Sequence, residues 1–270
     1  MTIIFQVKTK EAYAIKILAE LLANNIKTGC FEIDSAGIHL RMMDHHRKIL
    51  INLKLDGKSS GFTIYKFTTK KMFLGVNLNH FYKMLRAIKK KDSIELYIDD
   101  ENPTDLCIKV TPKENNRTTT SIIKIQSIQN LEIDLPEGYD RPISVPSSDY
   151  QKLIKEMNTI GSVVKISSKK FSIKFTCDAG GVLKKMVDFG ENDLDDQEII
   201  FSQDFNTEQL CRITKFAGLS DNIQIFPGFP LLFKTNIGTL GNMDIYIKSK
   251  EQLEKESYEL DESEDDDSDS

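Results

Sequence analysis

The stretch between residues 74 and 92, LGVNLNHFYKMLRAIKKKD, constrains the fold more than any other part of this chain. A spacing of i, i+3, i+4 and i+7 predicts one apolar helical face, formed by Phe81, Met84, Leu85 and Ile88. A different, cationic face is predicted from Lys83, Arg86 and Lys90. Either Asn77 or Asn79 can cap the start of this helix. Taken alone, such a charge run is most often a solvated surface.

The same arrangement recurs in other predicted helices, which is the reason to look beyond solvation. Residues 10–25 form a helix pattern that is apolar over much of its circumference, with Lys16 and Glu20 on its polar side. Ser147–Ser148 are predicted to cap a third helix, and residues 205–217 form a fourth. Both carry a basic pair three residues apart beside an apolar stripe: Lys152 and Lys155, then Arg212 and Lys215.

Short segments of alternating apolar and polar residues predict strands between these helices. Alternation on both sides of the turn at residues 35–37 predicts a hairpin. Further strands are expected at residues 49–55, 62–65, 94–98, 106–110, 118–125, 199–201, 223–225, 231–233 and 245–247, and residues 163–175 are expected to form a strand, a turn and a second strand. The order helix, strands, helix, strands occurs twice. We therefore predict an α+β fold with an internal duplication, although the repeat is weak in residue identity.

The predicted duplication divides the chain into two domains, at residues 1–126 and 142–250. The stretch between them, residues 127–141, is SIQNLEIDLPEGYDR and carries a Pro and a Gly, so we expect an extended linker. Residues 251–270 form an acidic tail with no apolar residue after Leu260. Such a segment cannot bury enough apolar surface to fold, and we expect it to be disordered.

The net charge of −5 is unexpected for a protein that binds nucleic acid, but the acid is unevenly placed. Seven of the last ten residues are Asp or Glu, and without those seven the formal charge would be +2. The four cysteines show no metal-binding spacing and lie in apolar segments: Cys30, Cys107, Cys177 and Cys211. They favour reduced core thiols. We recognise no signal peptide or membrane span, and expect a soluble intracellular protein without a membrane partner.

If the basic sides of these helices face the same direction, their Lys and Arg residues form a row of cations. Such a row is complementary to the phosphate backbone of duplex DNA. No aromatic residues are interleaved with these cations, so base stacking is not suggested. No cluster of Arg, Asn and Gln stands at a helix start to contact base edges. The residue types therefore predict phosphate contacts that are loose and independent of sequence.

Catalytic and metal sites have little support in the sequence. His45–His46 with Asp44 invites a metal site, but third and fourth ligands at a known spacing are missing, and a solvated turn fits better. A two-metal carboxylate cluster at Asp99, Asp100 and Glu101 is less favoured than a polar hairpin turn. Gly180–Gly181 lacks a nucleotide-binding fingerprint around it. We therefore expect no enzymatic activity, no metal and no cofactor.

Four stretches resemble the family of proliferating cell nuclear antigen, the eukaryotic DNA sliding clamp. They are CFEIDSAGIHLRMMD at residues 30–44, LGVNLNHFYKMLRAIKKKDSIELYIDDE at 74–101, LPEGYDRPISVPSSDYQKLIKEMNTIGSVVKISSKKFSIKF at 135–175 and GFPLLFKTNIGTLGNMDIYIKSK at 228–250. The resemblance extends over about residues 1–250. It implies a ring of three identical two-domain subunits that encircles duplex DNA, with helices lining a central hole and antiparallel sheets outside. DNA polymerase, other proteins with a clamp-binding motif, and a clamp loader are the implied partners.

By position, the resemblance assigns DNA contacts inside the hole to six residues: Lys16, Lys83, Arg86, Lys152, Lys155 and Lys215. Glu208 departs from the family, which has a basic residue there, while Arg212 supplies a charge one turn on. We include Arg212, and also Lys90 from the cationic face described above, among the expected DNA contacts. The departure at Glu208 leaves open how DNA passes the fourth helix.

The resemblance also implies a groove beside the linker into which a partner's short helical turn inserts apolar side chains. The matching apolar positions are Met43, Ile133, Leu135, Pro136, Pro230, Tyr246 and Ile247. Arg47, Lys48 and Lys248 replace smaller or neutral residues of animal family members. We therefore expect a more cationic rim that favours partners with acidic flanks.

Ring closure implies that residues 118–125 pair edge to edge with residues 182–187 of the next subunit. Lys170 matches a lysine that carries ubiquitin in some members, although Lys169 beside it leaves that assignment open. Two other functions are considered. One is a subunit of a heteromeric clamp or a monomeric processivity factor held on DNA by charge; the other is an enzyme acting on nucleic acid. We expect the protein in the nucleus, or at a cytoplasmic replication site if it is viral.

Overall fold

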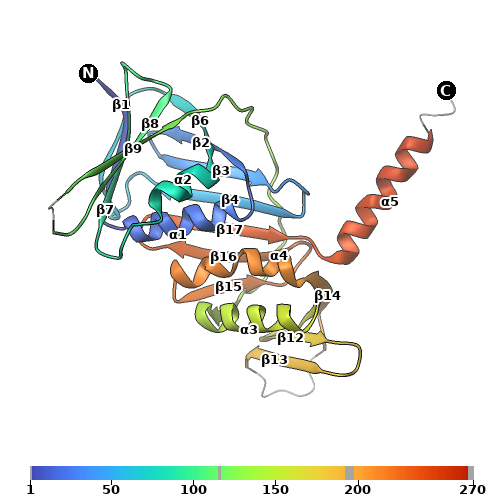
Figure 1. Ribbon diagram of the computed structural model, residues 1–270. Coiled ribbons are helices and arrows are strands. Elements are labelled where there is room, and N and C mark those ends of the chain that lie inside the picture. The colour runs from blue at the N-terminus through green and yellow to red at the C-terminus, as the bar shows by residue number, and fades with distance from the viewer. Residues whose placement is uncertain (1, 115–116, 192–197, 267–270) are drawn as a thin grey trace. The chain divides into compact units, whose positions relative to one another are not determined.

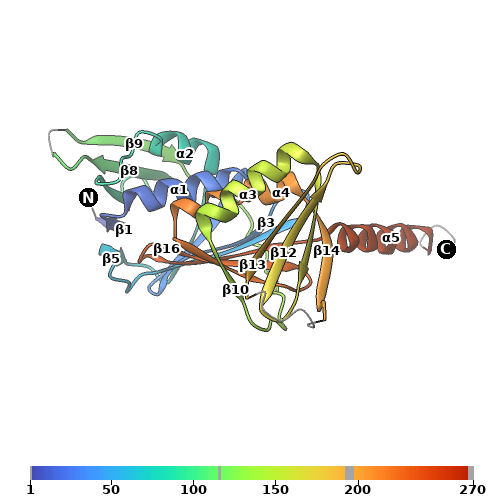
Figure 2. The same cartoon turned by 90° about the horizontal axis from the view of Figure 1, so that it is seen from below.

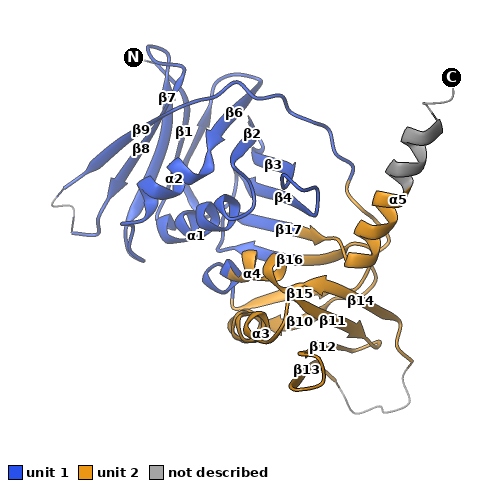
Figure 3. Cartoon of the chain, turned by 45° about the vertical axis from the view of Figure 1, so that its right-hand side comes forward, with its two compact units in different colours: residues 1–134, 215–220, 234–244 blue, residues 135–214, 221–233, 245–270 orange. Residues whose placement is uncertain are grey.

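The computed structural model describes residues 2–114, 117–191 and 198–266, and for residues 259–266 it describes the backbone only. The chain forms two compact units, which Figure 3 shows in different colours. Unit 1 comprises residues 1–134, 215–220 and 234–244, and unit 2 comprises residues 135–214, 221–233 and 245–270. After the predicted linker the chain therefore returns twice to unit 1.

Unit 1 contains a five-stranded antiparallel sheet in the order β5-β1-β7-β8-β9. Its strands are β1 (Ile3–Thr9), β5 (Phe62–Phe67), β7 (Ser93–Asp99), β8 (Asp105–Thr111) and β9 (Thr119–Lys124). The sequence analysis did not predict β1. Its residues Phe5, Val7 and Thr9 are buried and alternate with more exposed neighbours, as expected for a strand with one face on a core.

A second group of strands in unit 1 follows the order β4-β3-β2-β6. These strands are β2 (Thr28–Asp34), β3 (Gly37–Met43), β4 (Ile49–Asp56) and β6 (Lys71–Asn77). Ile33 pairs with Ile38 across the turn, which confirms the predicted hairpin. Strand β6 was not predicted. The final strands, β16 (Leu231–Ile237) and β17 (Gly241–Ile247), are divided between the units, with residues 234–244 in unit 1.

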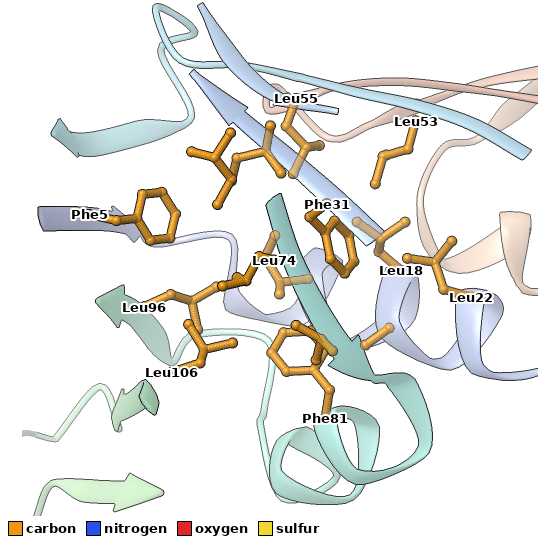
Figure 4. Close-up of a pocket in the computed structure, with 15 residues that line it drawn as sticks. Phe5, Leu18, Leu22, Phe31, Leu53, Leu55, Leu74, Phe81, Leu96 and Leu106 are labelled. Atoms are coloured by element: carbon orange, nitrogen blue, oxygen red, sulfur yellow. The ribbon is translucent and has the colours of Figure 1, made fainter. Parts of the chain in front are cut away.

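Helices α1 (Ala12–Ala23) and α2 (Leu78–Leu85) lie side by side over the core of unit 1 (Figures 1 and 2). A small cavity of about 60 Å³ lies in this core, between α1, α2 and strands of both sheets (Figure 4). Every residue that lines the cavity is apolar, including Phe5, Leu22 and Phe81. It is therefore a packing gap in the core and offers no polar group to a ligand.

Unit 2 contains a four-stranded antiparallel sheet in the order β13-β12-β11-β14. The strands are β11 (Val163–Ser168), β12 (Ser172–Asp178), β13 (Lys184–Gly190) and β14 (Phe201–Asn206). Separately, β10 (Ile143–Pro146) pairs with β15 (Asn222–Phe226). Helix α3 (Ser147–Ile160) buries the predicted apolar stripe: Tyr150, Leu153, Ile154 and Met157. The predicted caps at Ser147 and Ser148 are wrong, because Pro146 precedes the helix and no side chain caps it.

Two predicted helices are shorter than expected. Helix α2 begins as predicted, with Asn77 Oδ1 accepting a hydrogen bond from the His80 N–H at 3.0 Å. It ends at Leu85, so Ile88 and Lys90 lie beyond it, and Met84 is 42% exposed instead of packed. The buried carboxylate of Asp92 accepts the Lys89 N–H at 2.9 Å. This local bond favours a turn over a further helical turn.

The predicted fourth helix is divided into helix α4 (Thr207–Arg212) and the 3₁₀ helix η1 (Thr214–Gly218). Thr214 Oγ1 donates to the Cys211 carbonyl at 2.8 Å, a local bond at the point where the α-helical turns stop. Arg212 and Lys215 therefore lie on different elements, and the predicted i, i+3 pair on one helix is wrong at this position.

The predicted disordered tail is also different in the structure, because helix α5 (Lys250–Asp266) covers most of it. Ser249 and Gln252 form a reciprocal capping box: the Gln252 N–H donates to Ser249 Oγ, and the Ser249 N–H donates to Gln252 Oε1, both at 3.1 Å. Lys248 forms an ion pair with Glu256 at 2.6 Å. These local bonds start a helix that composition alone did not predict. Residues 267–270 lie outside the described residues.

No helix within the described ranges is both long and apolar enough to cross a membrane.

Candidate nucleic-acid interface

Two cations are presented to solvent in unit 1: Lys83 on α2, and Arg86, the residue that follows its last turn. Leu78, Phe81 and Leu85 are buried on one face, while Lys83 and Arg86 are exposed. Neither cation forms an ion pair with a carboxylate of any described residue. Both charges are therefore available to an anionic ligand, as the cationic face predicted.

Lys16 on α1 is held in place instead of extending into solvent. Its Nζ donates to the carbonyl of Ile88 at 3.0 Å and lies 5.4 Å from the centroid of the Tyr13 ring. Lys90 Nζ lies 5.9 Å from the same ring. Tyr13 therefore brings two of the predicted DNA contacts together, although they come from different segments.

Lys215 is partly neutralised by an acidic residue that the sequence analysis did not connect with it. Its Nζ lies 2.6 Å from the carboxylate of Glu20 on α1. Partial burial and the charge of Glu20 raise the pKa of the nearby Tyr82 hydroxyl. Residues 20 and 215 are distant in the sequence, so no local spacing rule could have paired them.

In unit 2 the predicted cations lie on α3 and α4. Lys152 and Lys155 are exposed on α3 and form no ion pair with a carboxylate among the described residues. Arg212 forms an i, i+4 ion pair with Glu208 at 2.8 Å, so the acidic residue that departs from the family is compensated within α4. Burial raises the pKa of the Cys211 thiol, and the nearby charge of Lys155 opposes this increase.

Two kinds of predicted DNA contact are thus distinguished by their partners. Four exposed cations on or next to α2 and α3 lack a described carboxylate partner: Lys83, Arg86, Lys152 and Lys155. Lys90, in the loop after α2, also lacks one and lies near the Tyr13 ring. Three others are engaged: Lys16 by a backbone carbonyl, Lys215 by Glu20 and Arg212 by Glu208. An engaged cation must give up its present partner before it can neutralise a DNA phosphate. We therefore expect Lys83, Arg86, Lys152 and Lys155 to contribute most to DNA binding.

The side chain of Asp44 bonds to the backbone of its own turn. Its buried carboxylate accepts the N–H groups of Lys48 and Ile49 at 2.7 and 2.9 Å. These bonds hold the β3–β4 turn, in which Arg47 has a φ of 56°. Within the described ranges, no group of three or more His, Cys, Asp and Glu side chains is arranged to hold a metal ion.

The acidic hairpin at residues 99–101 is also held by backbone bonds. Asp99 Oδ1 accepts the Asn102 N–H at 2.8 Å, and Asp100 Oδ1 accepts the Thr2 N–H at 2.7 Å. The hydrogen bond from Thr2 lowers the pKa of Asp100. These carboxylates order the β7–β8 turn, as the polar-turn interpretation predicted.

The predicted partner-binding residues of unit 1 lie at the end of β3, on the β3–β4 turn and in the middle of the linker. Met43 and Lys48 are half-buried and Arg47 is exposed. The half-buried Ile133 is held through its carbonyl, which accepts from Arg41 Nη1 at 2.9 Å.

In unit 2, Leu135, Pro136 and Pro230 are half-buried, but Tyr246 is only 5% exposed and Ile247 is fully buried. These two residues therefore belong to the packed core within unit 2. Tyr139, which the sequence analysis missed, donates from its hydroxyl to the Pro230 carbonyl at 2.6 Å, and its ring lies 6.0 Å from that of Tyr246. Burial raises the pKa of the Tyr139 hydroxyl well above its ordinary value.

Each unit ends one of its sheets in an edge strand at the position where the resemblance expects subunit contacts. Strand β9 is an edge of the five-stranded sheet, and β13 is an edge of the four-stranded sheet. Both carry an exposed apolar side chain: Ile122 is 58% exposed and Met186 is 56% exposed. Lys170 is exposed with its Nζ 5.3 Å from the Phe171 ring centroid, while Lys169 is half-buried.

Two units of antiparallel strands, with few and short helices that carry cations, define the architecture of the DNA sliding clamps. The chain belongs to the proliferating cell nuclear antigen family. The model of the family's N-terminal domain matches residues 4–134, and that of its C-terminal domain matches residues 134–250.

Individual relatives agree with this assignment over nearly their whole length. Proliferating cell nuclear antigen of Chaetomium thermophilum is 24% identical, over 91% of this chain and 97% of the relative. The probable DNA polymerase sliding clamp 1 of Paramecium bursaria Chlorella virus 1 is 25% identical, over 91% and 96%. The crystal structure of the antigen from Entamoeba histolytica has a TM-score of 0.80 at 22% identity, over 92% of this chain and all of that one. This likeness confirms the duplicated two-domain clamp fold.

Proposed function

We propose that this protein is a DNA polymerase processivity factor: three copies close a ring around duplex DNA and tether the polymerase and other replication proteins to it. The observation that carries the proposal is the set of four cations without a described carboxylate partner, which lie on α2 or at its C-terminal end in unit 1 and on α3 in unit 2. In a family of sliding clamps, such cations on short helices suit contacts with phosphates that carry no sequence information.

The proposed mechanism is topological. A closed ring stays on DNA because it cannot dissociate sideways, so individual phosphate contacts can be weak and exchange as the ring slides. No chemical step by this chain is part of the proposal. A closed ring also has to be opened before it encircles DNA without ends, which gives a clamp loader a role. The protein would act wherever its DNA is replicated, in a nucleus or at a viral replication site.

The number of chains in solution tests the proposal. Light scattering coupled to size-exclusion chromatography should give three times the chain mass, 30.8 kDa for one chain. A single-chain mass that persists at high protein concentration would contradict the ring, and would favour a factor held on DNA by charge. A trimer that forms only after mixing with another clamp protein would indicate a heteromeric ring.

Changing Glu20 to Gln should strengthen DNA binding. The substitution removes the carboxylate that pairs with Lys215 at 2.6 Å, so that this cation becomes available to a phosphate. Fluorescence anisotropy with linear duplex over a salt series should show a slope steeper by about 1. Glu32→Gln is the matched control, because it breaks the pair with Lys71 at 2.7 Å, which lies on β6. Equal behaviour of the two variants would remove Lys215 from the DNA contacts.

We also propose that partner peptides bind unit 1 at the half-buried Met43 and Ile133, which the resemblance assigns to a groove, with Arg47 and Lys48 at its rim. Arg47→Glu with Lys48→Glu should weaken a clamp-binding peptide with acidic flanks by about tenfold at low salt, because the charge complementarity is removed. A peptide with neutral flanks should bind almost as before. Isothermal titration of both peptides checks this, and equal weakening of the two would show that the rim does not select by charge.

A further inference from the structure

A recess of about 390 Å³ lies at one end of the five-stranded sheet in unit 1. Residues of the loop before β7, from Ala87 to Asp92, line one wall, and Pro112, Lys113, Glu114 and Arg117 of the β8–β9 hairpin line the other. Ser93 pairs with Thr111, and Val110 pairs with Thr119, so the strand register brings the two walls to the same end of the sheet. The site follows from this topology and from no single sequence motif.

Cations dominate the recess. Five of its lining residues are basic: Lys89, Lys90, Lys91, Lys113 and Arg117. All five side chains are exposed, and none forms an ion pair with any described residue. Two carboxylates also line the recess, but that of Asp92 is buried and accepts the Lys89 N–H at 2.9 Å. Only Glu114 therefore offers an exposed negative charge against the five cations.

The recess continues the cationic surface of helices α1 and α2. Lys16 of α1 donates to the carbonyl of Ile88 at 3.0 Å, inside the loop that forms the first wall. Lys90 extends back toward α1, with its Nζ 5.9 Å from the ring centroid of Tyr13. A polyanion that contacts Lys83 and Arg86 would therefore find further cations just beyond the end of α2.

We propose that this recess binds backbone phosphates of a nucleic-acid strand beyond the helix-borne contacts. The inference rests on the proposed function and adds a second place of contact to it. The phosphodiester backbone is the ligand class that fits, because the lining offers several compact ammonium groups and a guanidinium but no aromatic ring on which a base could stack. Binding would thus be independent of sequence and sensitive to salt.

The test is a triple substitution, Lys89→Glu, Lys91→Glu and Lys113→Glu, in the full chain. The matched control is Lys58→Glu, Lys66→Glu and Lys70→Glu, which changes three exposed lysines of the same unit and gives the same net charge. Anisotropy of a fluorescent linear duplex is measured over a salt series. The salt slope of the recess variant should fall by about 0.9 for each phosphate that the recess no longer neutralises, while the control should keep the wild-type slope. The salt slope of the corresponding Lys→Gln triple variant should fall by a smaller amount.

Each outcome decides a different point. If the recess variant and the control show the same salt slope for DNA binding, the proposal that the recess binds phosphates is wrong. If the recess variant no longer binds a polyglutamate peptide but keeps the wild-type DNA slope, that also overturns it and assigns the recess to an acidic protein partner. If the wild-type chain itself binds no DNA, the proposed function fails instead. Thermal unfolding midpoints of the Lys→Gln variant and the wild type should agree, because exposed substitutions change stability little.

Discussion

Reversing the charge of Lys83 and Arg86 should greatly reduce clamp-dependent DNA synthesis and leave the protein folded. Both side chains are exposed, and neither pairs with a described carboxylate, so the change to Glu breaks no described ion pair. It replaces two attractions for phosphate with two repulsions. We expect binding to linear duplex to weaken by at least about tenfold, and the salt slope to fall by about 2.

The matched control for this prediction is again on unit 1, at Lys66 and Lys70. Changing both to Glu alters net charge equally, but these exposed side chains lie on and after β5, away from α2 in the sequence and on a different element. Synthesis on a primed circular template measures the effect. If the Lys83 and Arg86 variant matches this control, the assignment of α2 to the DNA-facing surface is wrong.

A charge placed on both edge strands should convert the proposed trimer to single chains. Ile122 on β9 and Met186 on β13 are more than half exposed in the chain, so a polar side chain costs little there before assembly. In a closed ring the same positions are expected to lie in the contact between subunits. Aspartate there would bury an unpaired charge, which is strongly unfavourable. Ile122→Asp with Met186→Asp should therefore elute and scatter light as one chain.

Ile64→Asp provides the comparison for the edge strands. Ile64 is 37% exposed on β5, the opposite edge of the same sheet as β9. Because the proposal places no subunit contact on β5, this variant should keep the mass of three chains. Dissociation of both variants would mean that any loss of apolar surface disrupts the assembly. A trimeric Ile122 and Met186 variant would remove β9 and β13 from the interface.

Patterns with many repeating residues could be predicted from the sequence. The apolar stripe of α3 repeats over two turns, and all four of its predicted members are buried. The end of α2 could not be predicted in the same way. Ile88 and Lys90 continue the helical spacing, but a turn closed by the buried carboxylate of Asp92 forms instead. The bond from the Lys89 N–H to the Asp92 side chain favours this turn, and a pattern of apolar spacing carries no information about such a bond.

Contacts between distant residues were beyond prediction from spacing. The pair formed by Glu20 and Lys215 and the bond from Tyr139 to Pro230 both join segments that only the folded chain brings together. Helix α5 was different, because Ser249 and Gln252 have the spacing of a capping box. This local motif was not used in the prediction, which rested on the acidic composition of the tail alone.

Retention on DNA of different topology tests the central claim most directly. The trimer is loaded onto a closed circular plasmid, washed at a salt concentration that abolishes binding to short duplexes, and the plasmid is then cut once. The ring account predicts that protein stays on the intact circle through the wash and is released within the same wash after cutting. Dissociation from the intact circle at that salt concentration, or retention that does not change on cutting, would contradict it.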